Sequence, residues 1–256
     1  MKKLFAGVLL FVSFNVSASD LFALGRSGDT FNYAEYYQVQ ENHEALKFNL
    51  LTLTQIKQKF PLPTTPYNRL AQFGTWIHGE DRCLNTRAEV LKRDSKVNVS
   101  FTASGCSVSD GKWTDPYSGK SFASAADIQI DHFVPLKNAY MTGAFEWDSK
   151  KRCLYANYMG NNFHLLSVSG RENLVKSDNS PTGYIPPNPV YVCQYLKQWL
   201  EVKLIWSLRM TPEEVTIIKQ KAAEAQCDTN VFLVSATELQ AQRRYIADHA
   251  DLCHSR

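Results

Sequence analysis

Residues 127–136 hold two adjacent ionisable side chains, Asp131 and His132, directly after a short alternating run, and read Asp127-Ile128-Gln129-Ile130-Asp131-His132-Phe133-Val134-Pro135-Leu136. Ile128 and Ile130 alternate with polar residues, which is the period of a half-buried strand. Pro135 is expected to close the strand, because proline cannot donate to a hydrogen-bonded ladder. The segment therefore predicts a strand that presents Asp131 and His132 at its end.

A second strand and a helix are expected after a long excursion. Residues Leu165-Leu166-Ser167-Val168 predict a short strand. They run directly into Ser169-Gly170-Arg171-Glu172, a capping-box pattern that opens a helix. This helix should end before Pro181. The predicted order of elements is thus strand, excursion, strand and helix.

This order places several polar side chains near one another. Asn173 and Lys176 are three positions apart on the predicted helix and share a face. A strand-end Asp131 and His132 that face this helix could place one hard metal ion beside one general base. Hydrolysis of a phosphodiester needs that combination.

The amino-terminal residues have the pattern of a cleavable secretory signal. Lys2 and Lys3 precede an apolar run over residues 4–16, and small residues follow at 17–19. We expect a signal peptide over residues 1–18 and export of the mature chain, either to the periplasm or as a secreted protein. The apolar run is shorter than the roughly 18 residues that a membrane-spanning helix needs.

Composition and charge narrow the possible classes of protein. The chain has 256 residues, of which 44% are hydrophobic and 21% charged, so a disordered or low-complexity protein is excluded. Its formal net charge of +3 falls to +1 once the two signal lysines are removed. Affinity for nucleic acid must then come from a local basic patch. The basic clusters are Arg82, Arg87, Lys92, Arg93 and Lys96, and Lys150, Lys151 and Arg152.

The cysteines indicate disulfide bonds rather than a zinc site. An even number of them behind an export signal predicts bridges formed in an oxidising compartment, and none makes a Cys-x-x-Cys pair. Their pairing is left open, and activity that depends on oxidation is a further hypothesis, because Cys153 lies between the two predicted strands. The six candidates are Cys83, Cys106, Cys153, Cys193, Cys227 and Cys253.

The remaining signals predict an α+β domain behind a less regular extension. Residues 19–75 show no sustained period, with a proline-rich linker expected near 61–68, and residues 76–256 hold the segments described above and the last helices. Turns with short strands are expected over 105–119 and partly helical structure over 137–158. Thr86-Arg87-Ala88-Glu89 has the pattern of a capping box and predicts a helix over 86–94. Helices are also expected over 192–206 and from Thr211 and Ser235 onward.

Several separated blocks resemble one family of nucleases. In the same order along the chain, they are similar to HNH, or ββα-metal, endonucleases, and more narrowly to secreted proteins related to the nuclease domain of modification-dependent restriction enzymes. The resemblance covers about residues 82–215. Beyond residues 127–136, the blocks are Trp113-Thr114-Asp115-Pro116-Tyr117-Ser118-Gly119, Thr142-Gly143-Ala144-Phe145-Glu146-Trp147, Tyr155-Ala156-Asn157, Asn173-Leu174-Val175-Lys176-Ser177-Asp178 and Tyr184-Ile185-Pro186-Pro187.

The resemblance implies a ββα-metal motif embedded in a mainly helical, disulfide-stabilised α+β domain. It also implies that His132 is the general base that takes a proton from the attacking water. Asp131 and Asn173 would be the protein ligands of one divalent ion, for which Mg²⁺ is the first choice, because oxygen ligands and retained waters suit it. Lys176 would contact or neutralise phosphate.

The residue that orients the base stays open between two positions. The family usually has an asparagine immediately before the leucine of the second strand, and His164 takes that place here. Asn162 lies two positions earlier and has the expected residue type. Either residue could hydrogen-bond to the backbone near His132 and orient its ring. Arg171, Arg87 and Arg93 are further candidate contacts to substrate.

These expectations describe an exported, metal-dependent endonuclease, with DNA favoured as substrate and RNA left open. No motif indicates base-specific readout, so low sequence selectivity is expected. No protein partner is evident, and no membrane association is expected after signal cleavage. One rival is a non-catalytic secreted binding module on the same scaffold. A second is a cell-wall polysaccharide hydrolase, motivated by Trp113, Trp147 and Tyr184, which lacks a clear pair of carboxylates.

Overall fold

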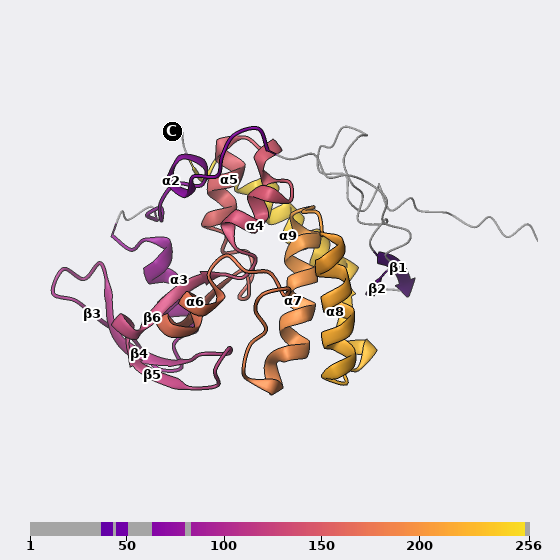
Figure 1. The fold of residues 1–256 in the computed structure, drawn as a ribbon. Helices are drawn as coiled ribbons and strands as arrows, with labels where there is room; N and C mark the ends of the chain where they lie inside the picture. Colours follow the sequence, from indigo (N-terminus) through magenta and orange to yellow (C-terminus); the bar gives the residue numbers. More distant parts are fainter. Residues whose placement is uncertain (1–36, 43–44, 51–62, 80–82, 254–256) are drawn as a thin grey trace, which may run out of the picture.

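The computed structural model describes residues 37–42, 45–50, 63–79 and 83–253, so the predicted signal peptide and Arg82 lie outside the described residues. Figure 1 shows helices and small sheets in a mixed arrangement. The strands are β1 (Tyr37–Asn42), β2 (Ala45–Leu50), β3 (Ser100–Phe101), β4 (Val108–Thr114), β5 (Ser121–Ser124), β6 (Ile128–His132), β7 (Leu165–Ser169) and β8 (Leu233–Ser235). The α-helices are α2 (Arg69–Gln72), α3 (Thr86–Asp94), α4 (Leu136–Met141), α5 (Ser149–Ala156), α6 (Gly170–Lys176), α7 (Val192–Ile205), α8 (Pro212–Glu224) and α9 (Ala236–Asp248).

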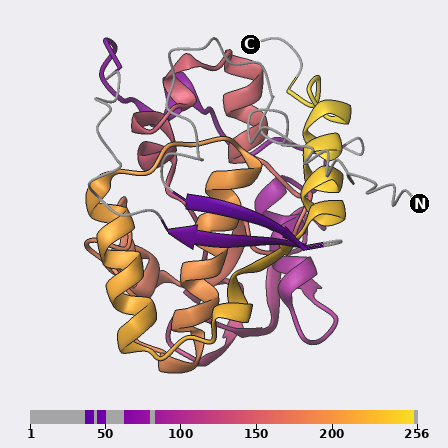
Figure 2. The same ribbon diagram turned by 90° about the vertical axis from the view of Figure 1, so that its right-hand side faces the viewer.

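The strands form three small antiparallel groups within the described ranges. Their orders are β1-β2-β8, β3-β4-β5 and β6-β7. In Figure 2 the arrows of β1 and β2 run side by side, and β2 pairs with β8 from the far end of the chain. Short 3₁₀ turns complete the fold: η3 (Ala125–Asp127), η4 (Ala144–Glu146), η5 (Pro189–Tyr191) and η6 (Thr229–Phe232). This mixture of helices and small sheets agrees with the predicted α+β class.

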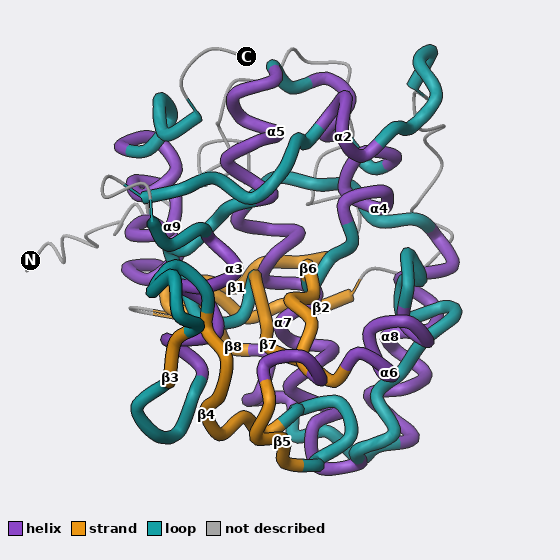
Figure 3. Tube along the Cα trace, turned by 90° about the vertical axis from the view of Figure 1, so that its left-hand side faces the viewer, coloured by secondary structure: helices purple, strands orange, loops and turns teal. Residues whose placement is uncertain are grey.

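The two strands predicted around the ionisable pair are confirmed, and they pair with each other. Their register runs from Ile128 opposite Ser169 to His132 opposite Leu165. The intervening excursion holds α4 and α5, and α6 follows β7 and lies against the pair (Figure 3). Ile128 and Leu165 are fully buried, since they pack against α3 and β4. The apolar face of this sheet therefore fixes the ends of β6 and α6 relative to each other.

The predicted helix at residues 86–94 is confirmed, but its cap differs from the prediction. The side chain of Asn85, not that of Thr86, accepts a hydrogen bond from the backbone N–H of Ala88 at 3.0 Å. The hydroxyl of Thr86 instead donates to Asn157 at 2.7 Å. The capping-box pattern was thus misplaced by one residue, because Thr86 makes a tertiary contact that local sequence does not reveal.

Two other predicted helix starts have the caps that the sequence indicated. Ser169 accepts from the backbone N–H of Glu172 at the start of α6. Thr211 and Glu214 form a reciprocal capping box at the start of α8. Because each cap satisfies an N–H that has no partner inside its helix, both starts are fixed by local sequence.

The larger hydrophobic core lies between the excursion and α7. Trp199 on α7 and Tyr155 on α5 are both fully buried in it, and α8 runs beside α7 in Figure 1. Lys203 of α7 is also fully buried, and its ammonium donates to Asn138 at 2.6 Å and lies 3.4 Å from the carboxylate of Glu214. Three helices therefore share one buried polar contact, which fixes their relative positions.

All six cysteines form disulfides, which confirms the predicted framework. The pairs are Cys83–Cys106, Cys153–Cys253 and Cys193–Cys227. The second pair joins α5 to the segment after α9 and closes the longest loop, with a sequence separation of 100. A loop of this length restricts the unfolded chain most strongly in the chain-entropy model.

Glu201 on α7 gives a testable pH dependence of stability. Its side chain is buried, and burial raises its pKa to about 7, an effect that Lys197 opposes and Glu238 reinforces. Below pH about 4.5 the carboxyl group of Glu201 is protonated in both the folded and the unfolded chain, so its titration does not lower the free energy of unfolding there. As pH rises towards about 7 the unfolded chain releases the proton first, and stability falls.

We therefore expect Glu201→Gln to be more stable than the wild type by on the order of 2 kcal/mol at pH 8, and about equally stable at pH 4. Thermal melts of both proteins at these two pH values measure the difference. A difference that is the same at both values would contradict the assigned titration of Glu201.

Candidate active site

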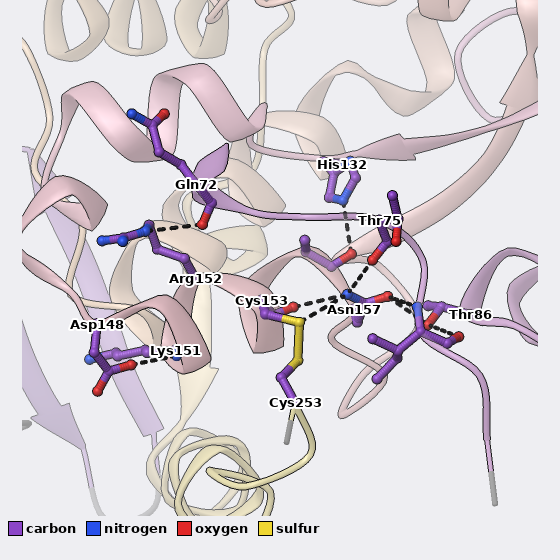
Figure 4. Close-up of a disulfide and its surroundings, with 12 residues drawn as sticks. Gln72, Thr75, Thr86, His132, Asp148, Lys151, Arg152, Cys153, Asn157 and Cys253 are labelled. Atoms are coloured by element: carbon purple, nitrogen blue, oxygen red, sulfur yellow. Dashed lines mark hydrogen bonds between the residues drawn. A yellow bond between two sulfur atoms is a disulfide. The ribbon is translucent and has the colours of Figure 1, made fainter. Parts of the chain in front are cut away.

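His132 ends β6 and is held in one tautomer by the backbone of α5. Its ring Nε2 lies 2.9 Å from the carbonyl oxygen of Ala156, as the dashed line from the ring in Figure 4 shows. A carbonyl oxygen only accepts, so Nε2 carries the proton in the neutral ring. The lone pair therefore lies on Nδ1, the nitrogen that could accept a proton from water.

The environment of His132 keeps the ring neutral and fixes its plane. Burial lowers its pKa to about 3, an effect that the hydrogen bond to Ala156 opposes and the nearby cations Arg69 and Lys176 reinforce. The indole ring of Trp76 stacks on the imidazole, with ring centroids 5.2 Å apart and an angle of 5° between the planes. The ring is thus held from one side by a carbonyl and on one face by an aromatic residue.

Asp131 is buried and both of its carboxylate oxygens have donors. Oδ1 accepts from the ammonium of Lys176 at 2.8 Å, and Oδ2 accepts from the hydroxyl of Tyr117 at 2.6 Å. Lys176 is fully buried and also donates to the carbonyl oxygen of His132 at 3.1 Å. Burial raises the pKa of Asp131 and lowers the pKa of Lys176, while the attraction between the two charges opposes both effects.

Tyr117 reaches Asp131 because of a turn between β4 and β5. The side chain of Asp115 accepts from the backbone N–H of Tyr117 at 2.9 Å and from the hydroxyl of Ser118 at 2.7 Å. Gly119 completes the turn with a φ of 73°, a conformation that glycine adopts without strain. The sequence predicted turns in this region, but it gave no signal for a contact with Asp131.

Asn173 lies on α6 at the predicted position and faces the same cavity. Its side-chain NH₂ donates to Gln129 of β6 at 2.7 Å, which leaves the amide oxygen as the end available to a ligand. Asp131, His132 and Asn173 all line a cavity of about 370 Å³. The structure therefore brings three of the predicted site residues together at one opening.

Neither of the two residues predicted to orient the base bonds to the ring of His132 in the structure, although the backbone of His164 lies next to it and accepts from the N–H of Phe133 at 3.0 Å. His164 is buried, and its own ring nitrogen Nε2 bonds to the carbonyl oxygen of Tyr155 at 2.8 Å. Asn162 is exposed and lies beside Arg93, outside the cavity that His132 lines. The ring of His132 is held by a backbone carbonyl instead, so neither residue type could have indicated its partner.

The arginines predicted as substrate contacts are largely used within the protein. Arg87 donates to the carbonyl oxygens of Ala125 and Ile128, and Arg93 pairs with Asp94 and donates to the carbonyl oxygen of Leu165. Both side chains thus brace the strands that carry the site. Arg171 is exposed on α6 but does not line the cavity. Lys176 is buried in its pair with Asp131.

The three aromatic residues that motivated the alternative of a polysaccharide hydrolase are buried. Trp113 is 1% exposed, Trp147 9% and Tyr184 6%. The indole N–H of Trp113 donates to the carbonyl oxygen of Leu91 inside the smaller core. These three rings therefore do not form a carbohydrate platform, and that expectation was wrong.

Residues before the predicted strands also contribute to the site. We call residues 63–77 the arm. Tyr67 and Arg69 of the arm line the cavity with His132, and the predicted linker ends where α2 begins. Asn157 holds the arm, because its side chain donates to the carbonyl oxygen of Thr75 and accepts from the backbone N–H of Ile77 (Figure 4). No periodicity in residues 63–77 indicated this contribution.

Comparisons with known proteins identify a family and a relative. The model of the family "GmrSD restriction endonucleases, C-terminal domain" matches residues 85–216, just over half of the chain. An "Uncharacterized secreted protein" of Arthroderma benhamiae is 38% identical over 152 residues, which are 59% of this chain and 72% of that protein. No solved structure matches. None of the helices in the described ranges has the length and hydropathy that crossing a bilayer demands.

These matches confirm the resemblance to the nuclease domain of modification-dependent restriction enzymes. The matched residues include both strands of the β6–β7 pair, α6, and the three predicted residues that line the cavity. The chain belongs to the family of the C-terminal domains of GmrSD restriction endonucleases.

Proposed function

We propose that this protein is a metal-dependent endonuclease of the HNH, or ββα-metal, type. The observation that carries the proposal is the tautomer of His132, because its hydrogen bond to Ala156 leaves the lone pair of Nδ1 as the acceptor. The β6–β7 pair and α6 supply the strand, strand and helix of the proposed motif. Membership of a restriction-endonuclease family supports the hydrolysis of nucleic acid.

In the proposed reaction His132 acts as the general base. Its Nδ1 takes a proton from a water molecule, which attacks the phosphorus atom, and the bond to the leaving oxygen breaks. The carbonyl of Ala156 then stabilises the protonated ring through the hydrogen bond from Nε2. Burial keeps the ring neutral before reaction, and the negative charge of a bound phosphate raises its pKa towards a value suited to a base.

Asp131 and Asn173 fit the role of ligands for one hard cation. A carboxylate has about four lone-pair sites, of which Lys176 and Tyr117 use two, and Asn173 keeps its amide oxygen. Mg²⁺ suits this pair, and when bound it would stabilise charge on the leaving oxygen. No group of three or more His, Cys, Asp or Glu side chains that could hold a metal occurs in the described ranges. We therefore expect weak metal binding that phosphate strengthens.

We favour DNA as the substrate and low sequence selectivity, with RNA as an outcome of the test. We also propose that the chain is exported. The predicted signal peptide, the three disulfides and the secreted description of the fungal relative support export.

The test is cleavage of supercoiled plasmid and of single-stranded RNA by the oxidised protein. We expect nicking of the plasmid in Mg²⁺, loss of cleavage in EDTA, and recovery when excess Mg²⁺ is added. A variant without His132, purified in parallel, controls for contaminating nucleases. Cleavage that persists in EDTA would contradict the metal requirement but not the nuclease activity. A folded protein that cuts neither polymer with Mg²⁺, Mn²⁺ or Ca²⁺ would favour the non-catalytic binding module.

A further inference from the structure

Arg69 lines the cavity and forms no ion pair with an acidic side chain among the described residues. Two cations line the cavity, and the other, Lys137, pairs with Asp178. Arg69 is exposed, and within the described ranges no ion pair or side-chain hydrogen bond of its guanidinium occurs. An exposed arginine beside Asp131 and His132 is therefore positioned for an anion from solvent.

The other cations near the site are committed to the protein. Lys176 is fully buried in its ion pair with Asp131, and Arg87 and Arg93 donate to backbone carbonyls of β6 and β7. Arg171 lies outside the lining of the cavity. A polyanionic substrate that reaches His132 needs positive charge at the opening, and among the described cations that line the cavity Arg69 offers it without an ion-pair partner.

The arm holds Arg69 in place rather than leaving it on a loose segment. The side chain of Asn68 caps the short helix that begins at Arg69, and the ring of Tyr67 packs against Phe73 and Tyr140. Phe73 is 1% exposed within the larger core. A cation on such a fixed backbone loses less conformational freedom when it binds a ligand.

A second set of contacts fixes the arm from its other end. Arg152 of α5 donates to the carbonyl oxygen of Gln72 at 3.0 Å, and Asn157 bonds to Thr75 and Ile77 (Figure 4). The same helix α5 ends in Ala156, whose carbonyl holds His132. The arm and the proposed base are therefore both held by α5 and the residue that follows it. The fold thus sets the spacing between Arg69 and His132.

We propose that Arg69 binds a phosphate of the nucleic-acid backbone next to the bond that is cut. This inference rests on the proposed function. A guanidinium donates two parallel hydrogen bonds to the oxygens of one phosphate, and it does so without regard to base sequence. The residue lies before the family match at residues 85–216, so the comparisons assign it no role.

The test measures binding and cleavage separately in Arg69→Ala and Arg69→Lys. Binding of a fluorescent oligonucleotide in EDTA is followed by anisotropy at several salt concentrations, and cleavage in Mg²⁺ gives KM and kcat. Arg244→Ala is the matched control, because Arg244 is exposed on α9 and the cavity lining includes no described residue of that helix. Melting temperatures verify that all variants are folded.

For Arg69→Ala we expect Kd and KM to rise about tenfold, with kcat changed by less than about threefold. The slope of log Kd against log salt should fall by about one, because one phosphate contact is lost. Arg69→Lys should keep the salt slope and lose part of the affinity, since a lysine retains the charge but not the paired donors. Arg244→Ala should behave as the wild type.

Two results would overturn the assignment. Unchanged Kd, KM and salt slope in Arg69→Ala would remove Arg69 from substrate binding, while cleavage by the wild type would leave the proposed function intact. A fall in kcat with unchanged Kd would assign Arg69 to the chemical step instead. If the wild type bound nucleic acid without cutting it, the proposed function would fail, and the anisotropy result would still decide the role of Arg69.

Discussion

His132→Ala is expected to slow cleavage by about 10²–10⁴-fold with little change in Kd for nucleic acid, the range that a positioned general base supplies. The physical reason is that His132, with its lone pair on Nδ1, lines the cavity, and no other described imidazole lines it. Removing the ring also removes the stack with Trp76, which lies beside the base. Single-turnover cleavage of a labelled duplex, together with anisotropy, measures the two quantities independently.

His164→Ala is the matched control for this variant. His164 is buried like His132, at 1% against 8% exposed, and its Nε2 bonds to the carbonyl oxygen of Tyr155, the residue before Ala156. The loss of its ring should lower stability, because it leaves a cavity, but should slow the folded enzyme far less than the loss of His132. If His132→Ala kept near wild-type rates while His164→Ala lost them, the assignment of the base would be wrong.

Lys176→Met should lower the free energy of unfolding by about 3–5 kcal/mol, the usual effect of removing one partner from a buried ion pair. Lys176 and Asp131 are 0% and 4% exposed at the level of their side chains, and their charged atoms lie 2.8 Å apart. Without the ammonium, the carboxylate, which is 4% exposed, keeps the hydroxyl of Tyr117 as its donor. Urea unfolding of the oxidised protein measures the loss.

A double-mutant cycle separates the coupling energy between Asp131 and Lys176 from the effect of changing the size and shape of each side chain. Asp131→Leu with Lys176→Met removes both charges, so the double variant should be more stable than Lys176→Met alone by at least about 1 kcal/mol. Additive losses in the two single variants would contradict a direct ion pair. Neither variant needs to be active, because the cycle measures stability only.

Local signals were enough to predict the elements that carry the site. The alternation at residues 127–131 and the Ser169 cap are properties of short windows, and the structure places β6 and α6 at them. The convergence of Asp131, His132 and Asn173 followed from the order of elements and from a resemblance to known nucleases. These are the cases in which sequence neighbours decide the structure.

The hydrogen-bond and stacking partners of those residues could not be predicted. They are distant in sequence, or they are backbone groups that every residue type provides. Tyr117 meets Asp131 through a turn, and Ala156 holds His132 through a backbone carbonyl that any residue would provide. Trp76 and Arg69 belong to the arm, where no period marks a functional face. Thr86 fitted the pattern of a cap, but a tertiary hydrogen bond to Asn157 took its hydroxyl.

The bridge between Cys153 and Cys253 determines what one proteolytic cut can do. It encloses β7 and α6, with Asn173 and Lys176, whereas Asp131 and His132 lie before it. Hydrolysis of any one peptide bond between the two cysteines leaves the fragments covalently joined. A nicked chain therefore keeps all of the cavity residues in one molecule, and a protease must cut this region twice to excise a piece of it.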